Sequence, residues 1–270
     1  IESSAFDGCT GISKLIIADN VETIGQYAFR NDSAIKELTI PISVNVVTIN
    51  QYSAFYNCTG ITKFNFTKGT GKGQDYNTDS YSYSTQCYVN TPMYYSRNNT
   101  IEVTMEEGIT SIGSYMFRDC TGITTLNIPS TVTSIGTNAF YGCSNWNSEV
   151  NVSQFEEVGS SAFYNCSKIV GEWTVLSKLE KVNAEAFYNC KNITGQLGFL
   201  ESITVISNNA FSGCTGITGE LNLSKVITIE SSAFDGCTGI SKLIIADNVE
   251  TIGQYAFRND SGIKELTIPI

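Results

Sequence analysis

The chain has 270 residues, with 26 acidic side chains, 16 basic side chains, no histidine and a formal net charge of −10 at pH 7. This acidic balance argues against nucleic acid or an anionic membrane surface as the main partner, because both attract basic patches. The absence of histidine excludes Ser-His-Asp and Cys-His catalysis and every zinc site that uses imidazole.

An Ala-Phe pair, once Met-Phe, recurs along the whole chain at a spacing close to 23 residues. The phenylalanines of these ten stations are Phe6, Phe29, Phe55, Phe117, Phe140, Phe163, Phe187, Phe211, Phe234 and Phe257. One gap is much longer, the 62 residues between Phe55 and Phe117. So constant a period predicts a solenoid, in which each repeat forms one coil and neighbouring coils bury each other's apolar faces.

The coil that begins at Cys120 shows the elements that each repeat predicts. The apolar pattern of residues 123–128 indicates a short strand whose inward side chains are two apart. Pro129 follows, and proline suits the exit of a strand because it has no N–H to donate to a neighbour. A second short apolar segment covers 132–135. We expect a tight helical or 3₁₀ turn around Phe140, with its ring in the core.

Residues 67–100 form an insert that is rich in Gly, Ser, Thr, Asn and Tyr. Long insertions in compact folds are often functional, and this composition is typical of adaptable binding loops. One hypothesis is therefore a recognition loop that binds through Tyr81, Tyr83, Tyr88, Tyr94 and Tyr95. The alternative is a variant long coil whose tyrosines pack on the flank of the solenoid.

Coils between 143 and 237 carry one more residue between the cysteine position and the strand than the other coils do. The extra residue accompanies a Gly-Glu or Gly-Gln step at 171–172, 195–196 and 219–220. We expect a local bulge at each step, since glycine tolerates the backbone angles that an inserted residue needs.

The central outward positions of the predicted strands hold small, mostly uncharged residues. The candidate binding residues among them are Thr39, Asn65, Asn127, Asn151, Thr174 and Asn222. Solenoids of this kind often bind partners on the strand side. Alternatively, asparagine and threonine simply suit solvated parallel strands, where they stack as ladders.

Eight of the nine cysteines lie three residues after a station phenylalanine. They are Cys9, Cys58, Cys120, Cys143, Cys166, Cys190, Cys214 and Cys237. Disulfides or a metal site are possible interpretations, but no Cys-x-x-Cys pair occurs. We expect instead a structural ladder of buried free thiols. Cys87 lies in the insert, where it is free, locally packed or available for an intermolecular contact.

These residues resemble the BspA-like, or Treponema pallidum-type, leucine-rich repeats. The resemblance is carried by units such as 120–143, which reads CTGITTLNIPSTVTSIGTNAFYGC, and it covers the chain except for about 67–100. It implies a single solenoid over 1–270 of about ten 23-residue coils, a right-handed superhelix with short parallel strands on one face and short helical or 3₁₀ turns or loops on the other. It also implies a bacterial or protist surface or secreted protein, and several members are adhesins.

Residues 1–42 and 229–270 are identical at 41 of 42 positions, the exception being Ala34 against Gly262. Neighbouring coils share far less, so this is a duplication with a period of 228 residues. The chain is interpreted as a fragment of a longer fibre or stalk built from such blocks, with a local duplication as the alternative.

The sequence thus predicts a non-enzymatic extracellular or cell-surface scaffold that serves adhesion or builds a fibre, without cofactors or metal. The alternative is a recognition ectodomain that binds a host or microbial protein or glycan through the insert or the strand face. Expected partners are a protein or glycan ligand, or further copies of the chain end to end. Nucleic acid is not expected, nor is membrane insertion, because no apolar run approaches the roughly 20 residues that a spanning helix needs.

Overall fold

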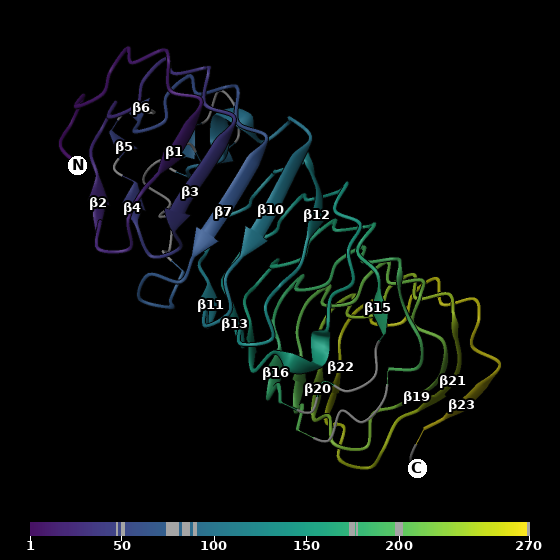
Figure 1. Cartoon of the computed structure of the whole chain (residues 1–270). Coiled ribbons are helices and arrows are strands. Elements are labelled where there is room, and N and C mark those ends of the chain that lie inside the picture. Colours follow the sequence, from purple (N-terminus) through teal and green to yellow (C-terminus); the bar gives the residue numbers. More distant parts are fainter. Residues whose placement is uncertain are drawn as a thin grey trace. The chain divides into compact units, whose positions relative to one another are not determined.

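The structure is a computed structural model (Figure 1) that describes residues 1–46, 48–49, 52–73, 81–82, 87–88, 91–172, 176, 178–197 and 202–268. It divides into two compact units, Ile1–Val132 and Thr133–Ile270, here called the N-unit and the C-unit. Each unit is a stack of coils with parallel strands and almost no helix, which is a repeat solenoid. That the two stacks form one domain of about ten coils stays a prediction from the sequence.

The N-unit contains one parallel sheet of five strands in the order β1-β3-β7-β10-β12, which lie side by side in Figure 1. A smaller parallel pair, β2-β4, forms at the next bend of the coil, and β5-β6 and β8-β9 are antiparallel. The elements are β1 (Lys14–Ile16), β2 (Thr23–Ile24), β3 (Glu37–Pro41), β4 (Asn45–Val46), β5 (Thr48–Ile49), β6 (Tyr52–Ser53), β7 (Lys63–Thr67), β8 (Tyr81–Ser82), β9 (Cys87–Tyr88), η2 (Tyr94–Ser96), β10 (Ile101–Met105), β11 (Ser111–Ile112) and β12 (Ile123–Leu126).

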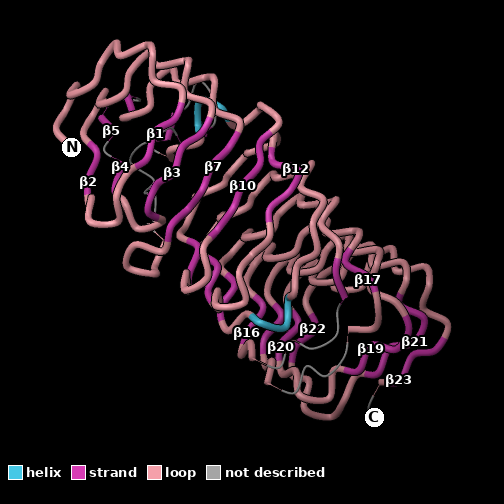
Figure 2. The backbone as a smooth tube through the Cα atoms, viewed as in Figure 1, coloured by secondary structure: helices cyan, strands magenta, loops and turns pink. Residues whose placement is uncertain are grey.

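The C-unit repeats this plan with shorter strands, in the parallel groups β15-β17, β19-β21-β23, β13-β14 and β16-β18-β20-β22. Figure 2 shows how much of the backbone is turn and how few helical turns there are. The elements are β13 (Ser134–Ile135), η3 (Val152–Gln154), β14 (Glu157–Val158), β15 (Gly171–Glu172), β16 (Lys181–Val182), β17 (Ile193–Thr194), β18 (Val205–Ile206), β19 (Gly219–Asn222), β20 (Thr228–Ile229), β21 (Ile240–Ile244), β22 (Thr251–Ile252) and β23 (Glu265–Thr267).

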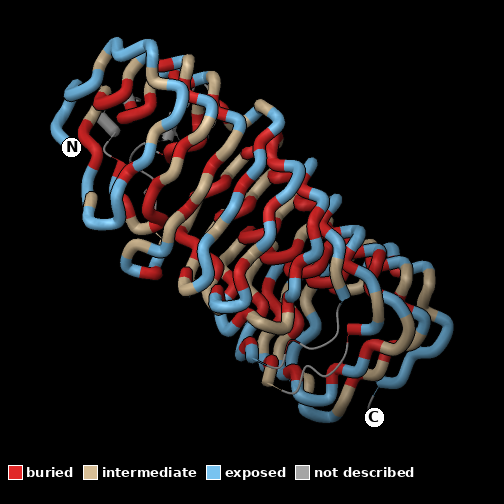
Figure 3. Tube along the Cα trace, viewed as in Figure 1, coloured by how far each residue is buried: buried red, intermediate tan, exposed pale blue. Residues whose placement is uncertain are grey.

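The strands alternate between core and solvent, as the sequence pattern predicts. In β3, Leu38 and Ile40 are buried whereas Glu37 and Thr39 are half-buried on the outer face. The buried side chains of successive coils form the core of each unit, and Figure 3 marks the buried residues in red along the trace of each coil. A core of this kind grows with every added coil, because no single coil can bury its own apolar face.

The phenylalanine stations are turns and contain no helix, so the predicted helical or 3₁₀ turn around Phe140 is wrong. At nine of the ten stations the residue two places before the phenylalanine takes a left-handed backbone. The residue two places after each phenylalanine has a positive φ in every coil, and the ten are Gly8, Asn31, Asn57, Asp119, Gly142, Asn165, Asn189, Gly213, Gly236 and Asn259. Only glycine, asparagine and aspartate occupy this place, because these residues tolerate the left-handed region best.

These turns join neighbouring coils by hydrogen bonds. At Phe163, for example, the N–H groups of Ser161, Phe163 and Asn165 donate to carbonyls of the next coil at 2.8–2.9 Å. The phenyl rings consequently stack into columns. Ring centroids are 5.2 and 5.5 Å apart along Phe6-Phe29-Phe55 in the N-unit, and 5.3–5.7 Å apart along the column from Phe140 to Phe257 in the C-unit.

The expected glycine bulges occur only in part. The pairing of β19 with β21 shifts register between Gly219 and Glu220, which confirms the bulge there. Gly171 and Glu172 pair with Ile193 and Thr194 without a shift of register, so no bulge is seen in this two-residue pairing. An extra residue can also be absorbed in the turn before the strand, where no partner fixes its place.

Gly236→Ala tests the left-handed turn without a steric complication. A Cβ at Gly236 has its nearest neighbours at 3.9 Å, so the cost of alanine is that of its backbone, at φ 79°. We expect Gly236→Ala to lower the free energy of unfolding by about 1 kcal/mol. Gly236→Asn, which restores the residue found at Asn165, should lose clearly less. Equal denaturation midpoints for the two variants would contradict this account.

Candidate functional site

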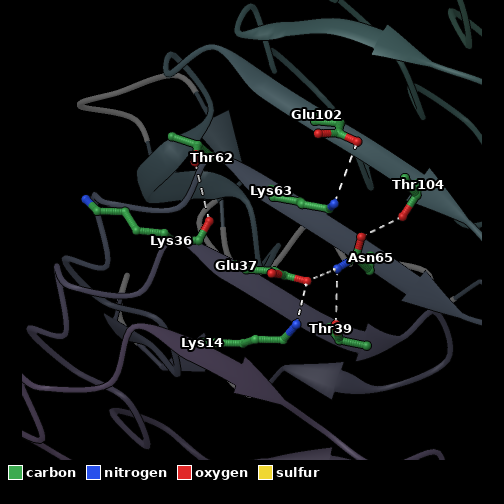
Figure 4. A network of polar contacts seen from close by, with 9 residues as sticks. All are labelled: Lys14, Lys36, Glu37, Thr39, Thr62, Lys63, Asn65, Glu102 and Thr104. Carbon is green, nitrogen blue, oxygen red and sulfur yellow. Dashed lines mark hydrogen bonds and ion pairs between the residues drawn. The ribbon is translucent and has the colours of Figure 1, made fainter.

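The outer side of β1, β3, β7 and β10 carries a connected set of polar side chains, here called the polar strand face (Figure 4). Asn65 lies at its centre. Its amide nitrogen donates to Glu37 Oε1 at 2.9 Å and to Thr39 Oγ1 at 3.2 Å, and its amide oxygen accepts from Thr104 Oγ1 at 2.7 Å. Three neighbouring strands are therefore tied together through one asparagine, and its position is fixed before any ligand arrives.

One outward position of these strands alternates in charge. In the parallel register Lys14 lies opposite Glu37, Glu37 opposite Lys63, and Lys63 opposite Glu102. The Lys14 Nζ–Glu37 Oε1 distance is 3.1 Å and the Lys63 Nζ–Glu102 Oε1 distance is 3.8 Å. Exposed pairs of this kind are each worth only about 0.2–1 kcal/mol, so they fix register more than they stabilise.

The C-unit repeats the alternation, with Glu220 opposite Lys242 and Lys242 opposite Glu265. Lys242 Nζ lies 2.9 Å from Glu220 Oε2. This hydrogen bond raises the pKa of Lys242, just as the hydrogen bond from Lys14 lowers the pKa of Glu37. Both pKa shifts favour the charged form of the side chain, so Lys242 and Glu37 stay charged around neutral pH.

The other predicted binding residues of the strand row do not join this network in the same way. Asn151 caps η3, because its side chain accepts from the Ser153 N–H at 3.2 Å. Asn222 makes the corresponding bond to the Ser224 N–H at 3.0 Å. Asn127 is exposed, and Thr174 lies outside the described residues. The structure thus connects Thr39 and Asn65, adds Thr104 and Glu37, and gives Asn151 and Asn222 local turn-forming roles.

The tyrosines of the insert that can be placed pack against the N-unit. Tyr94 is 6% exposed and Tyr95 packs against it. The Tyr95 ring lies 5.1 Å from that of Tyr56, and the Arg97 guanidinium lies 4.2 Å from the centroid of Tyr94. Their packing matches the variant-coil alternative. Tyr81 and Tyr88 are described only in their backbone, as is Cys87, and Tyr83 lies outside the described residues.

The ladder cysteines are thiols outside any disulfide, and seven are buried: Cys58, Cys120, Cys143, Cys166, Cys190, Cys214 and Cys237. Their thiols do more than fill space. The Sγ of Cys214 lies 2.9 Å from the Phe187 carbonyl oxygen of the preceding coil, and Cys190 does the same to Phe163 at 3.2 Å. The same carbonyl of Phe187 also accepts the Cys190 N–H. The thiols of Cys166, Cys190, Cys214 and Cys237 each use the second lone pair of a carbonyl that already accepts a backbone N–H.

Cys9 was predicted to belong to the ladder of buried thiols, and for this residue the prediction is wrong. Its side chain is exposed, because the first described coil packs against a neighbour on one side only. Burial raises the pKa of Cys58 and of Cys214 to about 12. Burial raises the pKa of Cys166, Cys190 and Cys237 as well, so these five thiols are neutral at physiological pH.

Two stations carry aspartate where the others have cysteine. Asp32 is fully buried, and neither carboxyl oxygen makes a hydrogen bond of ordinary geometry with the described residues. Burial raises the pKa of Asp32, and the N–H groups of Ala34 and Ile35 oppose this only in part. Asp260, its duplicate, is 8% exposed, and burial raises its pKa to about 7. A buried carboxyl whose nearby N–H groups offset its burial only in part destabilises the fold locally when it is ionised.

The described parts of the chain were also compared with the requirements of a metal site, a ligand pocket and a membrane-spanning helix. They contain no cluster of three or more Cys, Asp or Glu side chains suited to a metal ion. A hollow of about 430 Å³ on the C-unit is lined by side chains of both charges, Glu156, Glu157, Val158, Lys178, Glu180, Lys181 and Asn183. Within the same parts, no helix combines the length and apolar character that crossing a bilayer requires.

Comparison with protein families gives a match to the BspA type leucine rich repeat region, in six copies, over residues 1–91, 87–218 and 180–270. Comparison with curated proteins gives no match. Among solved structures, a leucine-rich repeat protein from Bacteroides ovatus is similar, with 20% identity over 98% of this chain and 82% of that chain and a TM-score of 0.49. A leucine-rich repeat protein of T. pallidum has 15% identity over 76% of this chain and 78% of that chain, with a TM-score of 0.44.

The thiol ladder predicts a sharp difference between the native and the unfolded chain. In the native protein we expect the seven buried thiols to resist a thiol reagent at pH 8, because they are neutral and inaccessible, and Cys9 to react at once. All nine should react in denaturant. Cys9→Ser is the matched control and should remove one rapid equivalent. Rapid modification of more than two native thiols would contradict the ladder.

Replacing Asp32 should reveal a dependence of stability on pH. A carboxyl whose folded pKa is raised stabilises fully below its unfolded pKa, and this contribution is lost as the pH rises through the folded pKa. Asp32→Asn and Asp32→Cys should therefore be more stable than wild type at pH 8, and the difference should shrink towards pH 4. The exposed Asp247→Asn serves as control. A difference between variant and wild type that does not change with pH would contradict this interpretation.

Proposed function

This chain belongs to the BspA-type leucine-rich repeat family, and from that premise we propose that it is a non-enzymatic scaffold of the cell surface, which serves adhesion by presenting its polar strand face. The observation that carries the proposal is the Asn65 network, which links three adjacent strands through hydrogen bonds of 2.7–3.2 Å. A face that is ordered in advance loses less conformational entropy when it binds a partner.

The chemistry of this face suits a large polar ligand. Its middle row offers hydroxyl and amide groups at Thr39, Asn65 and Thr104, and the Lys–Glu alternation runs beside it. Parallel strands repeat such groups at intervals of about 4.8 Å, which favours an extended protein segment or a glycan with a repeating pattern of hydroxyl groups. Small ligands favour enclosed apolar pockets instead.

The absence of catalysis is also part of the proposal. The chain has no histidine, burial holds thiols such as Cys58 in the neutral form, and some of its carboxylates, such as Glu37 and Glu220, pair with lysine across coils. These groups are used in stacking coils. The proposed surface location is supported by the family, because the resemblance to BspA-type repeats implies a surface or secreted protein.

The structural-fibre form of the scaffold is supported by the duplication of 1–42 at 229–270. A 228-residue period suggests that the scaffold is built from tandem blocks. In that form the polar strand face would recur once in each block, which raises avidity for a repeating ligand without any new contact.

The adhesion proposal predicts that ligand binding depends on the centre of the face. The 270-residue chain, applied to arrays of extracellular-matrix proteins and glycans, should bind at least one of them saturably. Asn65→Ala combined with Thr104→Ala should weaken that binding about tenfold or more, since two or three polar contacts are lost. Asn147→Ala, an exposed asparagine of the C-unit that takes no part in the Asn65 network, should bind as wild type does.

Circular dichroism and a denaturation midpoint separate a binding defect from a folding defect, because the double variant should lose only about 1–3 kcal/mol of stability. Unchanged binding by a folded double variant would overturn the role of the face. Loss of binding only on deletion of residues 74–90 would assign recognition to the insert.

A further inference from the structure

Three tyrosines of the C-unit form a stack of parallel rings beside the phenylalanine stations. Tyr141, Tyr164 and Tyr188 each follow a station phenylalanine directly in the sequence. The ring centroids of Tyr141 and Tyr164 lie 4.5 Å apart, with 2° between the ring planes. Those of Tyr164 and Tyr188 lie 4.4 Å apart, with 7° between the planes. We call these three residues the tyrosine stack.

The backbone holds the tyrosine stack in register. The Gly142 N–H donates to the Tyr164 carbonyl at 2.8 Å, and the Asn165 N–H donates to the Tyr188 carbonyl at 2.9 Å. Each ring therefore starts from a position that is fixed against the next coil, at about the 4.8 Å spacing of parallel chains. Burial raises the pKa of Tyr164, and a hydrogen bond with the Tyr188 side chain adds to this shift. The hydroxyl ends of these two rings therefore meet.

Tyrosine pairs of the N-unit have a different geometry. The ring planes of Tyr27 and Tyr56 meet at 85°, and those of Tyr94 and Tyr95 meet at 87°. Edge-to-face contact is one of the arrangements that aromatic pairs prefer. One ring then directs an edge at the face of the other, so equivalent carbon atoms do not face each other. In the parallel stack of the C-unit they do.

Solvent reaches the tyrosine stack but not the other oxidisable side chains of the same coils. The three tyrosines are half-buried, whereas Cys143, Cys166, Cys190 and Trp146 are 0% exposed. Susceptibility to oxidation follows exposure, so an oxidant in the solvent meets the tyrosines first. The Cys166 thiol directs its proton at the Phe140 carbonyl oxygen, 3.0 Å from Sγ. A carbonyl is not a base, and a thiol held in its neutral form reacts poorly.

We propose that the tyrosine stack is a site of oxidative cross-linking, at which Tyr164 joins Tyr141 or Tyr188 as dityrosine and bonds two neighbouring coils covalently. The oxidant is a peroxidase that uses hydrogen peroxide. Each of the two phenols gives up one electron and one proton, and the two phenoxyl radicals form a carbon–carbon bond between the ring carbons next to their hydroxyl groups. The hydrogen atom on each joined carbon then moves to the phenolic oxygen, which restores both aromatic rings. Hydrogen peroxide takes up the two electrons and two protons and leaves as two molecules of water.

The cross-link would act as a staple between coils. The ladder cysteines form no disulfide, so the described contacts between these coils are otherwise non-covalent. A covalent bond between two coils restricts the unfolded chain as a disulfide does, and the denaturation midpoint should rise by about 5 °C or more. The inference goes beyond the adhesion proposal and does not depend on ligand binding by the polar strand face.

Treatment of the 270-residue chain with a peroxidase and hydrogen peroxide tests the proposal. Wild type should gain dityrosine fluorescence and stay monomeric. After denaturation, a protease that cuts after glutamate separates the three tyrosines, because Glu149 lies between Tyr141 and Tyr164. Glu172 likewise lies between Tyr164 and Tyr188. Mass spectrometry should find the peptide of Tyr164 joined to one of the other two, with the loss of two hydrogen atoms.

Tyr164→Phe is the matched variant, because phenylalanine keeps a stacked ring and removes the phenol. It should lose both cross-linked peptide pairs, since Tyr141 and Tyr188 are then separated by a ring that cannot react. Tyr141→Phe should keep only the link between Tyr164 and Tyr188. Tyr56→Phe, in an edge-to-face pair of the N-unit, should leave the links of the stack unchanged. Circular dichroism checks that each variant is folded.

Dityrosine that maps only to tyrosines outside the stack, or only between separate chains, would overturn the proposal. The same holds if the denatured chain gives the links of the stack in equal yield, because the folded register would then have no part in the reaction. The staple is refuted separately if cross-linked wild type and equally treated Tyr164→Phe have the same denaturation midpoint.

Discussion

The hydrogen bonds between successive phenylalanine stations set the register on which the rest of the structure depends. At seven of the ten stations three backbone N–H groups reach carbonyls of the next coil, as at Ser161, Phe163 and Asn165. This geometry requires left-handed residues beside the phenylalanine, and their φ values lie between 53° and 79°. Every coil therefore has a glycine, asparagine or aspartate two residues after its phenylalanine. Because each coil repeats the same turn, the sequence repeats with a period close to 23 residues.

Once the register is fixed, like groups stack on like groups. Phenyl rings form columns, thiols reach the carbonyls of the preceding coil, and the Tyr141, Tyr164 and Tyr188 rings lie 4.4–4.5 Å apart. Each contact is individually modest, and the sum is shared between neighbours, so the stability of a coil is largely that of its interfaces. The outer face inherits the same period, and the polar network around Asn65 therefore spans strands that are far apart in sequence.

Much of this plan could be predicted from the sequence, because the core repeats directly in residue type. The spacing of Phe140 and Cys143, the inward leucines and the strand predicted at 123–128, which the structure forms over 123–126, all follow from one periodic pattern. The left-handed turns were missed although a signal existed, since the place before each ladder cysteine holds only Gly, Asn or Asp. The alternation of Lys14 and Glu37 could not be found without the strand register. The links from Asn65 depend on side-chain rotamers, which no periodic pattern specifies.

The central claim is that the station-to-station hydrogen bonds hold the coils in register. Amide hydrogen exchange measures it directly. The N–H groups of Phe163, Phe187 and Phe211 should be among the slowest to exchange, with protection falling towards the terminal coils, because each inner station has a neighbour on both sides. If these amides exchanged as fast as those of the exposed turn around Lys225, the ladder would not be the element that orders the fold.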